Sequence, residues 1–297
     1  MKKILLALCF SIFAFASTAY AKNDYSCDKH FIFFPGGPEG GPFGTIVYNG
    51  AVAAAEHTGC KVDYYWSQWN SEIMIKQFKE AVALQPDGIA IYGFPGDAAM
   101  RPIIEEAMSM GIAITTMNTP LPELEKTYKG DGFGYAGADL YTAGYNLGAK
   151  GVEVCGLSAG DKAFVWGLAS MPNRGDRTTG ALDALKDLGV EIVYQEIPDN
   201  VNSDASQGIP MYVATYAANP DIKMVITDHG GLTASLPTYM KAAGHGSVDV
   251  CGAGFDLSGP ITKGIKEGYI DVVIDQQPFI EGYMPIIQLW LTTKYGM

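Results

Sequence analysis

Positive charge is scarce in this sequence, and the scarcity limits which partners the protein can have. Its 297 residues include 20 Lys and Arg against 32 Asp and Glu, a formal net charge of −12, and the longest basic run is Lys2-Lys3. Nucleic-acid phosphates are held by clustered Lys and Arg, so we expect no nucleic-acid partner. Charged residues make up 18% and apolar residues 48%, which excludes a disordered chain and supplies a sizeable core.

The sequence also lacks the patterns that hold metals, redox pairs and nucleotides. Its four histidines are scattered and no Cys-x-x-Cys occurs, so we expect no metal site and no cofactor. The glycine-rich segment 35–44 has neither a G-x-G-x-x-G spacing nor a P-loop lysine, and its three prolines lack the amide donors that a pyrophosphate needs. We interpret this segment as backbone placed close to a small neutral ligand.

Long apolar runs are absent after the N-terminal region. Residues 4–16 are largely apolar, follow Lys2-Lys3 and precede Ala19-Tyr20-Ala21, the small-x-small pattern of a signal-peptidase site. This run is shorter than the roughly 20 residues that span a bilayer. We therefore predict a signal peptide over residues 1–21, cleaved after Ala21, and a soluble protein exported to the periplasm.

Four cysteines follow the predicted signal peptide, an even number in a compartment that permits disulfides. They are Cys27, Cys60, Cys155 and Cys251, which allow three pairings. Cys27 and Cys60 precede the strand-like runs 29–34 and 61–66, and neighbouring parallel strands would bring the two cysteines together. We prefer the pairs Cys27–Cys60 and Cys155–Cys251, and free buried thiols are the alternative.

Strand-like apolar runs alternate with helix-like segments along the rest of the chain. Strands are expected at residues 30–34, 61–66, 88–92, 112–117, 163–168, 191–197, 223–227, 248–255 and 270–274. Helices are expected at residues 45–57, 71–84, 97–110, 139–148, 178–188, 207–218, 232–243, 259–267 and 279–294, and residues 118–137 are expected to be rich in loops. Near-continuous apolar strands between helices indicate parallel sheets covered on both faces. We predict an α/β fold of two Rossmann-like lobes, each a parallel sheet flanked by helices.

Two open parallel sheets also indicate where a ligand binds. Ligands of such sheets bind beyond the carboxyl ends of the strands, which places a site in the cleft between the lobes. The loops expected to line it are residues 35–44, 66–70, 93–97, 118–119, 169–177, 228–229 and 256–257. His229 falls on one of these loops, where a hydrogen bond to a ligand is one role and a surface or core role the other. Trp66, Trp69 and Trp166 lie near strand ends and are candidate stacking platforms, with core packing as the alternative.

One segment raises an enzymatic alternative. Gly156-Leu157-Ser158-Ala159-Gly160 has the five-residue pattern of a hydrolase nucleophile elbow. That elbow needs a strand before the serine and a helix directly after it, whereas a strand-like run follows Ser158. A secreted serine hydrolase using Ser158 is therefore the less favoured alternative, and we predict no catalytic residue.

Several short segments occur in an order and spacing typical of one family. They are Gly41-Pro42-Phe43, residues 84–89, residues 111–118, Arg177-Thr178-Thr179-Gly180, Ile226-Thr227-Asp228, Gly254-Phe255-Asp256 and residues 274–278. With these segments the chain resembles type I periplasmic binding proteins of the simple-sugar branch, such as the ribose-binding components of ABC importers. The resemblance implies a multi-strand hinge, with residues 22–138 and 277–297 in the N-terminal lobe and 139–276 in the C-terminal lobe. Family members usually continue into a further strand, so we expect that either this lineage lacks it or the C-terminus is incomplete.

The resemblance also implies a set of ligand contacts. It places Phe43 on the face of a sugar, and it places polar contacts at Asn118, Asp139, Arg177, Asp228, Asp256 and Gln276. These polar side chains are planar and carry paired donors or acceptors, which suits them to grip vicinal hydroxyls.

The function expected from these observations is solute capture and not catalysis. We expect an exported monomer that binds a small neutral sugar or polyol between its lobes and delivers it to the permease of an ABC importer. The alternative from another class is a sensory receptor for chemotaxis or quorum-type signalling, whose closed form engages a chemoreceptor. The sequence does not name the sugar.

Overall fold

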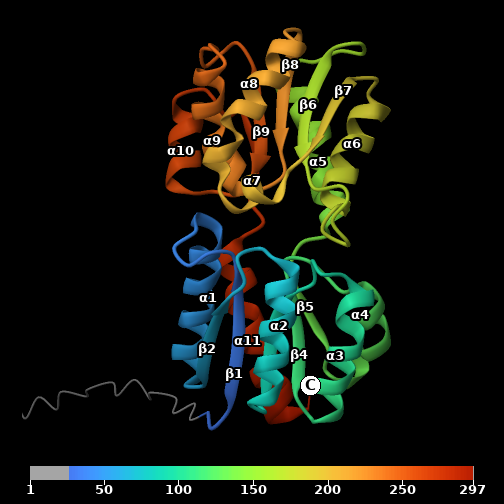
Figure 1. Cartoon of the computed structure of the whole chain (residues 1–297), viewed down its shortest axis with the longest axis vertical. Coiled ribbons are helices and arrows are strands. Elements are labelled where there is room, and N and C mark those ends of the chain that lie inside the picture. The colour runs from blue at the N-terminus through green and yellow to red at the C-terminus, as the bar shows by residue number, and fades with distance from the viewer. Residues whose placement is uncertain (1–26, 297) are drawn as a thin grey trace, which may run out of the picture.

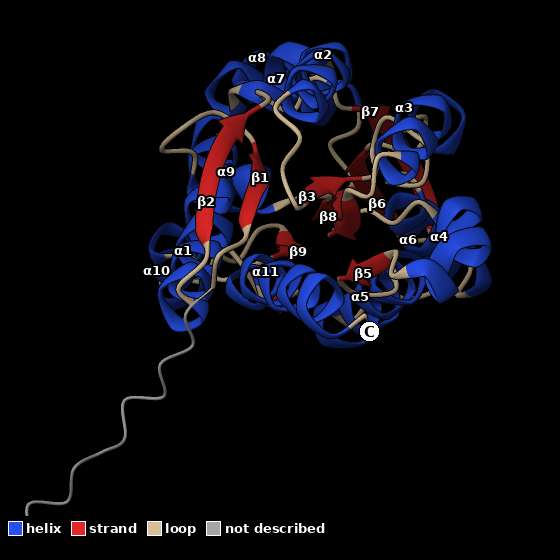
Figure 2. Cartoon of the chain, turned by 90° about the horizontal axis from the view of Figure 1, so that it is seen from below, coloured by secondary structure: helices blue, strands red, loops and turns tan. Residues whose placement is uncertain are grey.

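The computed structural model describes residues 27–296, which form two lobes stacked along the long axis of the molecule (Figure 1). The first lobe is built on a five-stranded sheet of order β2-β1-β3-β4-β5 and the second on one of order β10-β9-β8-β6-β7, with all strand pairs parallel. Helices surround the strands, as the view along the long axis shows (Figure 2). The predicted α/β fold of two helix-flanked parallel sheets is confirmed.

The elements of the first lobe come from both ends of the described chain. They are β1 (His30–Gly36), α1 (Pro42–Thr58), β2 (Lys61–Trp66), α2 (Ser71–Ala83), β3 (Gly88–Tyr92), α3 (Asp97–Ser109), β4 (Ala113–Met117), α4 (Pro122–Tyr128), the 3-10 helix η1 (Lys129–Asp131), β5 (Gly134–Ala136) and α11 (Pro278–Tyr295). The second lobe contains α5 (Leu140–Cys155), β6 (Lys162–Gly167), α6 (Asp176–Asp187), β7 (Glu191–Glu196), α7 (Asp199–Ser203), the 3-10 helix η2 (Ala205–Gly208), α8 (Ile209–Ala218), β8 (Ile222–Thr227), α9 (Gly230–Ala242), β9 (Cys251–Phe255), α10 (Gly259–Lys266) and β10 (Val272–Ile274).

The inner strands are apolar on both faces because helices cover both sides of each sheet. Every residue of β3 is buried, and so are all residues of β1 after His30. The outer strand β2, by contrast, is at best half-buried along its length. The lower burial of β2 agrees with its place at one edge of the first sheet.

Several sequence predictions about element boundaries are wrong. The helix predicted at residues 139–148 continues to Cys155 as α5, and the strand predicted at residues 248–255 begins only at Cys251 as β9. Residues 118–137 are not mainly loop, since they contain α4, η1 and the three-residue strand β5, which is too short to give a periodic signal. Helix α1 begins at Pro42 and not at residue 45, because proline is favoured in the first helical turn, where its missing N–H costs nothing. The earlier start places Phe43 and Gly44 in the first turn of α1.

The chain passes between the lobes at residues 137–139 and 275–277, within the part that the structure describes. After the second passage α11 runs back along the first lobe and packs against α1 (Figure 1). Glycines allow the two helices to approach closely: a Cβ at Gly50 would lie 2.0 Å from the carbonyl oxygen of Phe279, and one at Gly282 would lie 1.9 Å from that of Val47. The C-terminal helix is therefore an integral part of the first lobe.

Each lobe carries one disulfide. Cys27 bonds Cys60 with a Cα–Cα distance of 4.7 Å, and Cys155 bonds Cys251 with a Cα–Cα distance of 5.8 Å. The first pair follows from strand register, because His30 of β1 lies opposite Lys61 of β2 and the preceding residues meet at the same end. The preferred pairing is confirmed.

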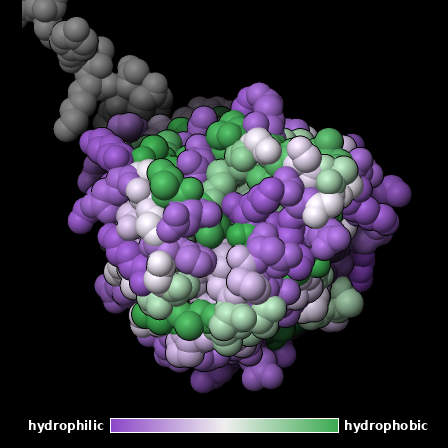
Figure 3. Space-filling model, turned by 90° about the horizontal axis from the view of Figure 1, so that it is seen from above, coloured by the Kyte–Doolittle hydropathy of each residue, from purple (hydrophilic) through white to green (hydrophobic). Residues whose placement is uncertain are grey.

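No described helix is both long enough and apolar enough to cross a membrane. The predicted signal peptide lies outside the described residues. The outer end of the second lobe presents a mainly hydrophilic surface with separate hydrophobic patches (Figure 3). The large apolar side chains of this lobe are mostly inside it, where Trp166, Tyr212 and Tyr239 are fully buried.

The close contact between α1 and α11 gives a stability test. Gly282→Ala should lower the free energy of unfolding by about 1–3 kcal/mol, the usual cost of overpacking, although alanine is the better helix former. Gly259→Ala at the start of α10 is the control, since a Cβ there would meet nothing within 4 Å. Urea denaturation measures both variants, and equal stabilities would contradict the packing of α11 on α1.

Candidate functional site

A cavity of about 420 Å³ lies between the two lobes and is lined by the segments that follow their strands. In the first lobe these segments follow β1 to β4, and in the second lobe they follow β6 to β10. The carboxyl ends of the two parallel sheets thus face one another across the cavity. This position agrees with the general rule for ligand sites of open parallel sheets.

The first lobe contributes an aromatic wall made of Phe43, Trp69, Tyr92 and Phe94, all of which line the cavity. Trp69 is its centre, with ring centroids 5.9 Å from Phe43, 5.4 Å from Tyr92 and 6.4 Å from Phe94. The hydroxyl of Tyr92 is engaged away from the cavity, since it donates to the carbonyl oxygen of Pro35 at 3.2 Å. This side of the cavity is therefore mainly an apolar surface of ring faces and edges.

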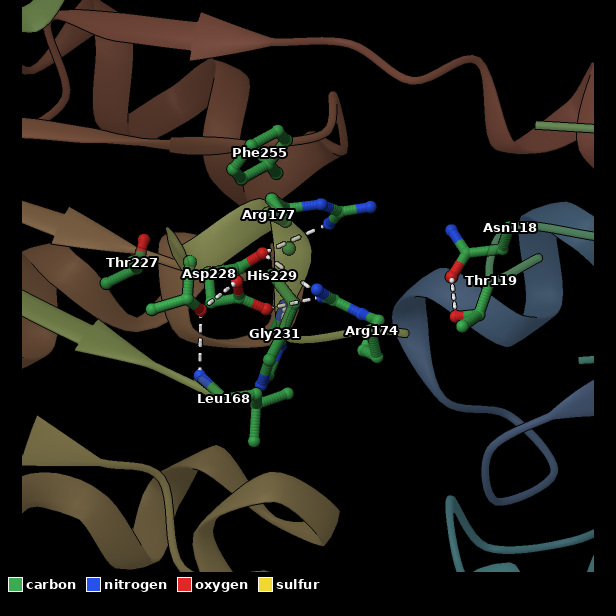
Figure 4. Close-up of polar contacts among 12 residues, drawn as sticks. Asn118, Thr119, Leu168, Arg174, Arg177, Thr227, Asp228, His229, Gly231 and Phe255 are labelled. Carbon is green, nitrogen blue, oxygen red and sulfur yellow. Dashed lines mark hydrogen bonds and ion pairs between the residues drawn. The ribbon is translucent and has the colours of Figure 1, made fainter. Parts of the chain in front are cut away.

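The second lobe contributes a buried cluster of charges around Asp228 (Figure 4). Arg174 forms an ion pair with the Asp228 carboxylate, and Arg177 donates from Nη1 to the Asp228 carbonyl oxygen at 3.1 Å. Thr178 donates to Asp228 Oδ1 at 2.9 Å, and the guanidinium of Arg177 lies over the ring of Phe255, 4.3 Å from its centroid. Figure 4 shows both arginines between Asp228 and the first-lobe residues Asn118 and Thr119. Asp228 thus orients two cations toward the cavity.

A chain of hydrogen bonds joins the lobes beside the cavity. Asn118 Nδ2, at the end of β4, donates to Gln276 Oε1 at 2.9 Å, and Gln276 Nε2 donates to Asp256 Oδ1 at 2.6 Å. Arg177 also donates to Gln276 Oε1, and Asp256 Oδ2 accepts from the backbone N–H of Gly230 at 3.0 Å. Asn118 and Asp256 have φ angles of 57° and 76°. This left-handed conformation is costly for a side-chain-bearing residue, although less so for Asn and Asp, and it is often found at functional sites.

Glu281 of α11 lies behind Asn118 and is almost fully buried, with 3% of its surface exposed. Its Oε2 accepts from Asn118 Nδ2 at 3.1 Å, and its Oε1 has no hydrogen-bond partner. Burial raises the pKa of Glu281 to about 8, against the opposing effects of Asn118 and Arg177. Glu281 is consequently protonated in the folded protein at neutral pH.

The other buried acids of the site have contrasting pKa values. Burial also disfavours the ionised form of Asp228, but the charges of Arg174 and Arg177 outweigh it and hold the pKa of Asp228 below its usual range. Burial raises the pKa of Asp256, despite the nearby Arg177. For His229, burial lowers the pKa to about 4, so its imidazole is neutral at neutral pH.

The structure brings together most of the residues predicted for the site. Seven of them line the cavity: Phe43, Trp69, Asn118, Arg177, His229, Asp256 and Gln276. Asp228 lies behind the arginines and is not among the lining residues, and Asp139 caps α5, where its side chain accepts from the N–H of Thr142. Trp66 packs on Tyr48 and Trp166 is fully buried among aromatic residues of the second lobe.

Sequence reasoning missed four prominent lining residues: Tyr92, Phe94, Met171 and Arg174. Phe94, Met171 and Arg174 do fall within loops that the strand-end rule nominated. Arg174 carries the clearest available signal, since it is a second arginine on the same loop as Arg177. Its role depends on Asp228, a partner that is distant in sequence.

Two other predictions concern sites elsewhere in the protein. Ser158 is exposed on the loop before β6, its N–H donates to Asp161 at 2.8 Å, and β6 follows it, so the strand–serine–helix order of a nucleophile elbow is not present. Among residues 27–296, no group of three or more His, Cys, Asp or Glu side chains is arranged to hold a metal ion.

Two α/β lobes with a cavity of ligand size between them define a two-lobed binding protein. A family model described as a periplasmic binding protein domain matches residues 32–292. The chain belongs to this family.

Known proteins similar to the chain include one curated relative and many solved structures. The xylose/arabinose-binding protein XylF of Sulfolobus acidocaldarius is 22% identical over 242 residues, covering 77% of this chain and 58% of that protein. A periplasmic sugar-binding protein of an ABC sugar transporter from Legionella pneumophila has a TM-score of 0.78 at 21% identity, covering 91% of this chain and 96% of that one. A carbohydrate transporter from Acidothermus cellulolyticus, solved with myo-inositol, has a TM-score of 0.77 at 24% identity, covering 91% and 88%. These relatives are described as binding or transport proteins and not as enzymes.

The raised pKa of Glu281 predicts a dependence of stability on pH. The folded state holds the proton more tightly than the unfolded state, so this contribution is fully present below about pH 4.5 and is lost as the pH rises toward 8. Glu281→Gln removes this titration. Between pH 5 and 8 the free energy of unfolding of the variant should fall less than that of the wild type. The difference should be at least about 1.4 kcal/mol, the equivalent of one pKa unit. Urea denaturation at several pH values measures this difference.

The control is Glu106→Gln, which changes an exposed glutamate on α3. Because Glu106 is exposed, this variant should follow the wild-type dependence on pH. Parallel curves for the wild type and Glu281→Gln would show that Glu281 does not titrate in this range.

Proposed function

We propose that this protein is an exported solute-binding protein that captures a sugar, a polyol or a close derivative between its lobes and delivers it to the permease of an ABC importer. The observation that carries the proposal is the cavity between the lobes, with an aromatic wall on one side and a buried hydrogen-bonding network on the other. A sugar has the same two-sided character, since its ring carries C–H faces and a rim of oxygens. The curated relative XylF is named for xylose and arabinose, which supports the same ligand class.

The proposed contacts divide between the two lobes. Phe43 and Trp69 would stack on the C–H face of the ring, because both are half-buried and line the cavity. Arg174, Arg177, Asp256 and Gln276 would bond the oxygens, with Asn118 assisting from the first lobe. Asp228 would act indirectly, by holding the arginines in place. Hydrogen bonds to charged groups are worth about 1.5–3 kcal/mol each, so a few of them suffice for micromolar binding.

Closure of the lobes on the ligand is the proposed signal to the permease. The lobes already touch beside the cavity, where Asn173 of the second lobe donates to Asp97 at 3.0 Å and to the carbonyl oxygen of Pro120 at 3.1 Å. A ligand that bonds both lobes favours the closed arrangement over an open one by its difference in affinity for the two. The proposal also includes export to the periplasm after cleavage at Ala21, the lobe boundaries given above and action as a monomer.

A sensory partner is the second candidate. One solved structure with the same fold is described as a complex of XylFII with LytSN, at a TM-score of 0.80 and 18% identity. A closed form that engages such a partner, or a chemoreceptor, uses the same cavity. Loss of sugar uptake on deletion of the gene favours the importer, whereas intact uptake with loss of a sugar response favours the receptor.

The ligand class is tested by thermal shift and then by calorimetry. We expect at least one member of a panel of pentoses, hexoses, polyols and their acids to raise the melting temperature, because a ligand that binds only the folded state stabilises it. Phe43→Ala should then weaken binding of that ligand at least about tenfold, which corresponds to about 1.4 kcal/mol. The control is Phe279→Ala, which removes a partly exposed phenylalanine of α11 that is not among the lining residues. If no member of the panel stabilises the protein, the proposed ligand class is wrong.

A further inference from the structure

Three nitrogen atoms on cavity-lining residues of the second lobe are buried without a hydrogen-bond partner. They are Arg174 Nη1, Arg177 Nε and His229 Nε2. Arg174 and Arg177 expose only 7% and 1% of their surface, so water does not solvate these groups freely. Buried polar groups are nearly always paired in folded proteins, and a cluster of unpaired ones requires an explanation.

All three nitrogen atoms are donors. Arginine has only N–H groups and no acceptor, and it keeps its charge at neutral pH, since the pKa of Arg177 is lowered only to about 10 by its burial. His229 is neutral, with a pKa of about 4 that results mainly from burial. Its Nδ1 accepts from the N–H of Gly231 at 3.2 Å, which places the proton on Nε2. The second lobe therefore offers three unused N–H groups.

Three acceptor side chains beside this cluster, by contrast, already accept hydrogen bonds. Asp256 Oδ1 accepts from Gln276 and Oδ2 from the N–H of Gly230. Gln276 Oε1 accepts from Asn118 and Arg177, and Asn118 Oδ1 accepts from Thr119 at 3.4 Å. A ligand hydroxyl brings a hydrogen that needs an acceptor, whereas a carboxylate brings acceptors only. The surplus of donors favours a carboxylate.

The charges of the cluster point in the same direction. Arg174 and Arg177 carry two positive charges, and Asp228 is the one buried carboxylate of the cluster whose pKa is lowered. Asp204 also lines the cavity with a lowered pKa, for which its hydrogen bonds with Ser206 are the main cause, but it is exposed to solvent. The pKa values of Asp256 and Glu281 are both raised, with burial as the main cause, and Tyr92 and Tyr135 also face Glu281 as neutral phenols. Two buried positive charges thus face one buried negative charge, and a ligand anion would restore the balance.

We infer that the ligand is a sugar acid, an aldonate or a uronate, whose carboxylate binds the N–H groups of Arg174, Arg177 and His229 while its carbon skeleton lies against the aromatic wall. This inference rests on the proposed function and narrows its ligand class. The three N–H groups are buried in the present arrangement, so the carboxylate reaches them through a small opening of the lobes or a rotation of the arginines. Charge-assisted hydrogen bonds of this kind are the strong ones in protein sites.

Calorimetry with matched neutral and acidic sugars tests the inference. The pairs are D-galactose with D-galacturonate, D-glucose with D-glucuronate, D-xylose with D-xylonate and L-arabinose with L-arabinonate. In at least one pair the acid should bind at least about tenfold more tightly than its neutral partner, and the difference should persist at physiological salt because the site is buried. If the neutral sugar binds as well as or better than the acid in every pair that binds, the inference is wrong while the proposed function stands. If no member of any pair binds, the inference is wrong, and the thermal-shift panel decides separately on the proposed function.

A double variant tests the residues that create the preference. Arg174→Gln alone would leave Asp228 buried without its ion-pair partner, so we combine it with Asp228→Asn and remove both charges together. The double variant should lose the preference for the acid by at least about tenfold. The matched control is Arg101→Gln with Glu105→Gln, which removes an exposed ion pair of 3.3 Å on α3 and should leave the preference unchanged. A double variant that folds, as judged by circular dichroism, and keeps the full preference would overturn the assignment of the carboxylate to Arg174.

Discussion

The buried carboxylate of Asp228 is the group on which the second-lobe side of the site depends. It lies just after β8 and is 4% exposed, so its charge is tolerated only because Arg174 pairs with it and Thr178 donates to it. Thr178 in turn accepts from the N–H of Leu168 just after β6, which ties the ends of two adjacent strands to the start of α6. Arg177, one residue before Thr178, is held over Phe255 by the same arrangement. Removal of this carboxylate would leave two buried cations without their main counter-charge, so the arginines cannot be treated as independent of it.

The hydrogen bonds that link the lobes are few, and beside them Met171 of the second lobe packs against the hydrophobic cores of both lobes. Asn118 and Gln276 carry it beside the cavity, and Asn173 carries it through Asp97 and Pro120 on another side. At the second contact the backbone of Gly96 comes so close to Pro172 that a Cβ would lie 2.8 Å from its side chain. A few hydrogen bonds exposed to water on opening are worth little net free energy, because water replaces them. In the proposed function, the contacts that a ligand makes with both lobes add to these interactions and favour the closed arrangement.

The fold could be predicted from the sequence because its signals are local. Apolar runs such as residues 88–92 become fully buried inner strands, and the cysteine positions before β1 and β2 anticipate one disulfide. The site could be predicted only as far as position along the chain determines it. The strand-end rule indicates the loops that carry Phe43 and Arg177, and the family resemblance selects these two residues. The pairing of Arg174 with Asp228 joins residues far apart in sequence, and it places Asp228 behind the arginines and not among the lining residues. The helical segment α4 and the short strand β5 were missed because neither is long enough to show a period.

The two sides of the cavity differ in what they cost to desolvate, and this difference suggests an order of events. Removal of water from the aromatic wall of the first lobe is favourable, because its rings are apolar and the hydroxyl of Tyr92 is already bonded to Pro35. The arginines of the second lobe are buried, so moving them to reach ligand oxygens is favourable only when those oxygens are correctly placed. Under the proposed division of contacts, a ligand held first by the second lobe has its oxygens in place before the wall closes over its carbon face. Closure then removes water from the arginine–ligand hydrogen bonds and strengthens them, so each lobe contributes what the other lacks.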